Sequence, residues 1–116
     1  MGKAIVGFQY AERVKSELII AAKMIDHFGE LTGDELKGAS RLFSFFLMAL
    51  EGEINIAYNV LERTEFEFAA AKVKEAAEKV NLKQYDEAVR LLSEAISHVA
   101  STGQWAMQTL KNHNLL

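Results

Sequence analysis

Apolar residues recur at intervals of three and four along almost the whole chain, and no four-residue stretch alternates as a β-strand would. This periodicity indicates helices that each have one apolar and one polar face. The pattern divides into four segments, which we predict to be helices at about 5–28, 33–63, 65–80 and 84–112. Four amphipathic helices with short connections favour an all-α fold, an antiparallel four-helix bundle in which residues 1–116 form one domain.

The predicted helix ends depend on capping residues, because the chain contains no proline to stop a helix. Gly29 and Asn81 are expected to close the first and third helices in the left-handed conformation. Thr32 and Glu35 have the spacing of a capping box at the start of the second helix, and Thr64 is expected to start the third helix in the same way.

The length of the second helix predicts the shape of the molecule. A helix over 33–63 spans about 45 Å, whereas a compact globule of this chain length is only about 35 Å across. A break at Gly52 would remove the conflict, but the apolar periodicity continues on both sides of this glycine. We therefore expect an elongated bundle.

The second helix carries more apolar residues than one face can hold. Its expected core stripe consists of Leu36, Ala39, Leu42, Phe43, Phe46, Ala49, Leu50, Ile54, Ala57 and Leu61. The surplus consists of Phe45, Leu47, Met48, Ile56 and Val60, to which the first helix adds Ile19, Ile20 and Met24.

Three explanations compete for this surplus: burial of the second helix at the centre of one chain, a surface that closes a two-fold dimer, or a groove for an apolar ligand or a partner helix. The dimer is favoured, because such a patch exceeds what monomers usually expose.

Residues 69–100 resemble a single tetratricopeptide-type helical hairpin. The resemblance rests on the spacing of Ala76, Tyr85-Asp86-Glu87-Ala88, Leu92 and Ala95. The sequence departs from the repeat at Lys72, Glu75 and Lys79, where aromatic or aliphatic residues are expected, and at Ala100, which replaces the closing proline. A solenoid needs about three stacked repeats. The resemblance implies a role in protein interaction and no catalysis.

Composition narrows the class of protein. Half of the residues are hydrophobic and a quarter are charged, which excludes a disordered or a membrane-spanning chain. The absence of cysteine excludes disulfides, thiolate metal ligands and a cysteine nucleophile. A net charge of −3 gives no electrostatic reason to bind nucleic acid or an anionic membrane. The chain begins without a signal-peptide pattern. We expect a cytoplasmic protein with no nucleic-acid or membrane partner.

Ionisable side chains offer few candidates for a metal site. Glu94 and His98 are four residues apart and share a helix face, but carboxylate-bridged di-metal bundles use Glu-x-x-His pairs, which do not occur in this chain. No glycine-rich phosphate loop, serine elbow or His-Glu-x-x-His motif occurs either. The sequence predicts no cofactor.

Two pairs of glutamates have the spacing of a magnesium site. The pairs Glu62/Glu65 and Glu75/Glu78 are similar to the acidic helix motifs with which all-α nucleotide pyrophosphatases hold Mg²⁺. The predicted cap at Thr64 places a helix break inside the first pair, and the second pair lies among lysines on an expected solvated face.

The leading hypothesis is a non-enzymatic interaction or scaffold protein that forms a homodimer. The predicted interface residues are Phe45, Met48, Ile56, Val60, Ile20 and Met24. One alternative is a metal-dependent nucleotide hydrolase that uses the paired glutamates. Another is a bundle that binds an apolar ligand between its helices.

Overall fold

Four long helices account for most of the chain in the structure, a computed structural model that describes residues 2–115. They are α1 (Gly2–Ile25), α2 (Gly33–Leu61), α3 (Thr64–Asn81) and α4 (Tyr85–Asn112). A 3₁₀ turn, Phe28–Glu30, follows α1, and the described residues contain no strand. The all-α fold and the four predicted helices are confirmed.

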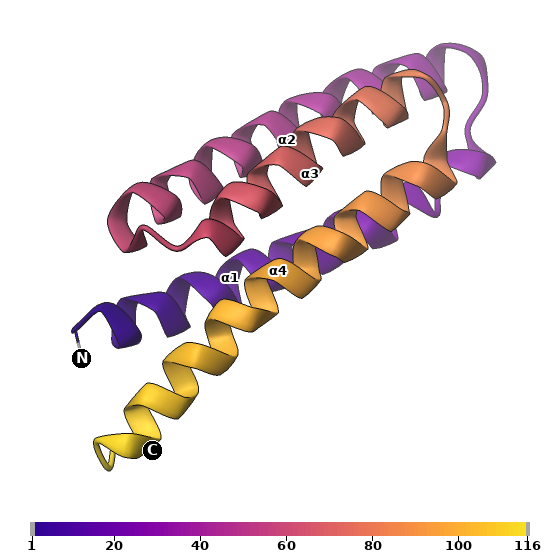
Figure 1. The fold of residues 1–116 in the computed structure, drawn as a ribbon. Helices are drawn as coiled ribbons and strands as arrows, with labels where there is room; N and C mark the ends of the chain where they lie inside the picture. Colours follow the sequence, from indigo (N-terminus) through magenta and orange to yellow (C-terminus); the bar gives the residue numbers. More distant parts are fainter. Residues whose placement is uncertain (1, 116) are drawn as a thin grey trace.

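The helices run antiparallel along a molecule that measures 55 × 22 × 18 Å (Figure 1). The helix α3 packs against both α2 and α4, and α1 packs mainly against α4. Contact between α1 and α2 is much slighter, so the bundle is least closed along this side. The predicted elongated bundle is confirmed, and α2 continues through Gly52 without a break.

The core of the bundle is made of aliphatic and aromatic side chains from all four helices. On α2 the buried positions are Phe43, Leu47, Leu50, Ile54, Ala57 and Leu61. Three predictions on this helix are wrong. Leu47, predicted to be surplus, is fully buried, whereas Leu42, predicted to be in the core, is 72 % exposed, and Ala49, also predicted to be in the core, is exposed. Spacings of three and four form a narrow seam, and α2 buries only this seam because it packs mainly on α3.

Several helix ends differ from their predictions. Gly29 lies inside the 3₁₀ turn without a positive φ, and α1 ends earlier than predicted, at Ile25. Asn81 is the last residue of α3, and Lys83 takes the left-handed conformation in its place. Phe28 is buried in the core from the 3₁₀ turn that follows α1, so the core face continues past the end of the α-helix.

The predicted capping boxes do not form. Thr32 precedes α2 in an extended conformation, but its side chain makes no capping hydrogen bond. The cap of α3 is Arg63 rather than Thr64, and it also lacks a side-chain capping bond. The helix ends are held instead by packing, for example where Phe28 meets Phe43 and Tyr85 edge-on, with ring centroids 5.3 and 5.4 Å apart.

The α2–α3 turn is packed against the C-terminal part of α4 by a cation–π contact. The guanidinium of Arg63 lies 4.2 Å from the ring centroid of Trp105. A Cβ atom added at Gly7 would come within 3.1 Å of the same ring, so α1 approaches Trp105 closely because residue 7 is glycine. Trp105 therefore joins α1, α4 and the α2–α3 turn.

Candidate interaction surface

The six predicted interface residues are exposed in the single chain. We call Phe45, Met48, Ile56, Val60, Ile20 and Met24 the α1/α2 surface. Phe45 is 54 % exposed, Met48 61 % and Ile20 54 %. This exposure excludes the first explanation for the apolar surplus, in which one chain buries it.

An apolar hollow of about 600 Å³ lies where α1 and α2 separate. It forms because α1 packs on α4 while α2 packs on α3, which leaves the side chains between the two helices without partners. No charged or hydrogen-bonding side chain lines it. The lining residues are Ile20, Met24, Phe28, Ala39, Leu42, Phe43, Phe45 and Phe46. The structure thus brings Ile20, Met24 and Phe45 together from two helices.

An ion pair crosses from α1 to α2 beside the apolar residues. The Nε of Arg13 lies 2.6 Å from Oε1 of Glu53. Partial burial raises the pKa of the nearby Glu17 carboxyl, and its hydrogen bond with Glu53 raises that pKa further. Because this polar group lies at residue 53 of α2, it separates Phe45 and Met48 from Ile56 and Val60 along the helix.

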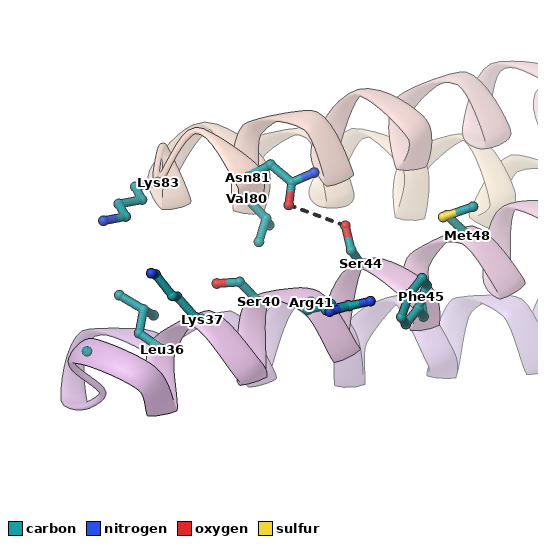
Figure 2. A pocket seen from close by; sticks show the side chains of 11 residues that line it. Leu36, Lys37, Ser40, Arg41, Ser44, Phe45, Met48, Val80, Asn81 and Lys83 are labelled. Atoms are coloured by element: carbon teal, nitrogen blue, oxygen red, sulfur yellow. Dashed lines mark hydrogen bonds between the residues drawn. The ribbon is translucent and has the colours of Figure 1, made fainter.

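A second hollow, of about 520 Å³, lies on the other flank of α2, against the end of α3 (Figure 2). Three of its lining residues are basic: Lys37 and Arg41 on α2, and Lys83 in the α3–α4 turn. None of the lining residues is acidic. Ser44 and Asn81 also line this hollow, and the Ser44 hydroxyl donates a hydrogen bond of 3.4 Å to Asn81 Oδ1.

The residues predicted for metal chemistry are engaged elsewhere. Glu94 forms an ion pair with Lys72 at 2.9 Å, and the hydrogen bond from Lys72 lowers the pKa of this carboxyl. The His98 ring lies against Phe68, with centroids 5.3 Å apart. The structure therefore gives Glu94 and His98 separate partners rather than a shared site.

The paired glutamates do not gather with other metal ligands. Glu62 caps the C-terminus of α2 while Glu65 lies on α3, where it binds Arg63 at 2.7 Å, so the predicted break within this pair is confirmed. Glu75 and Glu78 are exposed on α3. Within residues 2–115, no three side chains of His, Cys, Asp or Glu come together as a metal site would require.

The basic hollow is the feature that sequence reasoning missed. Lys37 and Arg41 share a face with Ser40 and Ser44 through their spacing of four, which was a usable signal. Lys83 lines the same hollow because the α3–α4 turn brings it there. Its backbone in this turn is left-handed, with a φ of 61°. No periodicity in the sequence predicts that approach.

Comparison with known proteins identifies no relative: neither family models nor curated proteins nor solved structures match this chain. The described helices also include none that is both long and apolar enough to cross a membrane. The tetratricopeptide resemblance of residues 69–100 stays a prediction.

Proposed function

We propose that this chain is a non-enzymatic interaction protein of the cytoplasm, and that it works as a homodimer joined through the α1/α2 surface. The observation that carries the proposal is the exposure of large apolar side chains along the one side of the bundle where neighbouring helices scarcely touch. Leaving this surface in water is unfavourable by about 25 cal/mol for each Å² of apolar area.

The size of this side of the bundle suits a second copy of the chain. At about 1.5 Å per residue and about 10 Å in width, α1 and α2 together present a face on the order of 800 Å². Stable interfaces bury roughly 800 Å² on each partner. A small ligand in the apolar hollow would leave Ile56 and Val60 exposed, whereas a second bundle covers both ends of the surface.

The face of α2 is complementary to itself in an antiparallel arrangement. Phe45 and Gly52 lie one heptad apart on the same face, and a Cβ atom at Gly52 would meet no atom within 4 Å. A two-fold axis midway between them places Phe45 of each copy over Gly52 of the other.

The oligomeric state of wild type and of Phe45→Glu tests this proposal. Light scattering on a size-exclusion column should give about 26 kDa for the wild type, twice the chain mass of 13.0 kDa. Phe45→Glu should raise the dimer dissociation constant about thirtyfold or more, as expected when a central interface residue is lost.

Phe68→Glu is the matched control. Phe68 is 50 % exposed, close to the 54 % of Phe45, but lies on α3 beside α4. This variant should remain dimeric. A wild-type monomer at tens of micromolar would overturn the proposal, as would a monomer that carries a bound apolar ligand between α1 and α2.

A further inference from the structure

We propose that the basic hollow between α2 and α3 binds a small amphipathic organic anion, one anionic group attached to an apolar body. The hollow is formed by a single chain, and its apolar end shares Phe45 and Met48 with the α1/α2 surface.

Charge at one end of the hollow favours an anion. Lys37 and Lys83 lie on opposite sides of this end, one on α2 and the other in the α3–α4 turn (Figure 2). Within residues 2–115, no carboxylate forms an ion pair with Lys37, Arg41 or Lys83, although Asp34 and Glu35 lie nearby in sequence. Like charges brought together repel one another, and a bound anion would relieve this repulsion.

The chain holds Lys83 in this position against a backbone cost. Its φ is 61°, in the left-handed region that costs a non-glycine residue roughly 1 kcal/mol or more. The amide of Lys83 donates to the carbonyl of Val80 at 3.0 Å, and the amide of Gln84 donates to the carbonyl of Lys79 at 2.8 Å. These two bonds fix the turn, so the lysine is directed to the hollow by a defined loop.

The opposite end of the hollow favours an apolar body. Phe45 and Met48 lie there, and Val80 contributes to the wall from α3 (Figure 2). Between the two ends, Ser40, Ser44 and Asn81 supply hydroxyl and amide groups that can donate hydrogen bonds. The volume of about 520 Å³ is within the range of small-molecule sites. Along the hollow, Lys37 and Lys83 therefore lie at one end and Phe45 and Met48 at the other, with the polar groups between them and Arg41 beside Phe45 (Figure 2).

Nuclear magnetic resonance titration of the backbone amides tests the site. The probes are decanoate, an aliphatic carboxylate, and adenosine monophosphate, an aromatic phosphate; whichever binds identifies the source of the anion. Binding should shift the amides of Ser40, Ser44, Asn81 and Lys83. Inorganic phosphate, which lacks an apolar body, and decanol, which lacks charge, should bind at least about tenfold more weakly.

The double variant K37Q/K83Q should bind the preferred probe at least about tenfold more weakly than wild type. K74Q/K111Q removes the same charge from exposed positions elsewhere and should bind as wild type does. The proposal is overturned if neither anion shifts these amides at about 1 mM, if K37Q/K83Q binds as tightly as wild type, or if the shifts fall on Ile20, Ala39 and Leu42 in the apolar hollow.

Discussion

Thr102 is a polar side chain in an otherwise apolar core. It is fully buried on α4, and its Oγ1 has no hydrogen-bond partner within the described residues. Valine has nearly the same shape without the hydroxyl, so Thr102→Val removes the cost of burying an unpaired polar group. We expect the free energy of unfolding to rise by about 1 kcal/mol, measured by urea denaturation. A loss of stability would show that the hydroxyl is bonded in solution.

Glu17 should make the stability depend on pH. Burial, and then the hydrogen bond with Glu53, raise the pKa of Glu17 in the folded state above its ordinary value of 4.5. The folded protein therefore holds this proton more tightly than the unfolded chain does. The resulting stability is fully present below pH 4.5 and is lost as the pH rises through the folded-state pKa.

Glu17→Gln should consequently raise the melting temperature at pH 7, and this gain should shrink as the pH falls toward 4.5. Circular dichroism melting curves at both ends of this range measure the effect. Glu75→Gln, at an exposed position of α3, is the control and should show little change at either pH. An equal gain at all pH values would contradict the assignment to proton binding.

Single residues also mark where sequence reasoning succeeded and failed. The exposure of Phe45, Met48 and Ile20 could be predicted, because the periodicity of a helix specifies which positions exceed its buried face. The burial of Leu47 could not, because Phe43, Leu47 and Leu50 form the seam only once α2 packs on α3 rather than on α1. A helix pattern defines an apolar face, but the neighbouring helices decide which part of it is covered.

At the scale of the helix, Gly52 of α2 distinguishes a free surface from an interface. The space above it is open in the single chain, so a larger side chain fits there and also favours the helix, in which glycine costs about 1 kcal/mol relative to alanine. In the proposed dimer the same space receives Phe45 of the second copy. Gly52→Leu should therefore weaken the dimer by about 1–3 kcal/mol, measured by sedimentation equilibrium.

Gly38→Leu is the matched control for this prediction. Gly38 lies one heptad before Phe45 on the same face of α2, with nothing within 4 Å of an added Cβ, but in this register it faces Asn59 rather than Phe45 of the second copy. It should leave the dimer intact. If Gly52→Leu dimerises as well as Gly38→Leu does, the two copies do not meet in this register.

The extent of each helix was predictable, but the chemistry of its ends was not. Periodicity locates a helix from many residues at once, so the long apolar repeats of α2 and α4 left little ambiguity. An end depends on one or two residues, and the backbone at Lys83 takes the left-handed conformation that Asn81 was predicted to adopt. Tertiary contacts of rings such as Phe28 outweigh the weak preferences of capping residues.

At the scale of the molecule, the shape of the assembly follows from where the apolar side lies. The monomer is 55 Å long, and the α1/α2 surface runs along this length rather than at an end. The proposed dimer is therefore a side-by-side pair. Small-angle X-ray scattering should give a greatest dimension close to that of the monomeric Phe45→Glu variant, with a thicker cross-section. A dimer about twice as long would contradict the proposed interface.

The surface and the basic hollow differ in how far the sequence could predict them. All six surface residues could be recognised as surplus on one or other of two helices, since both patterns are local. The hollow needs Lys37 from α2 beside Lys83 from a turn, which are brought together only by the packing of α3 on α2. Sites made within one helix are visible in a linear pattern, whereas sites shared between helices depend on the fold.

The position of Trp105 gives the molecule a built-in optical reporter. It is the one tryptophan of the sequence, and its indole is enclosed by Arg63 and by the backbone at Gly7. Its fluorescence emission therefore reports whether α1 and the α2–α3 turn remain packed against α4. Occupation of the hollow near Lys83, which lies toward the other end of α3, should leave this emission unchanged, while separation of the two helical pairs should shift it to longer wavelengths as water reaches the ring.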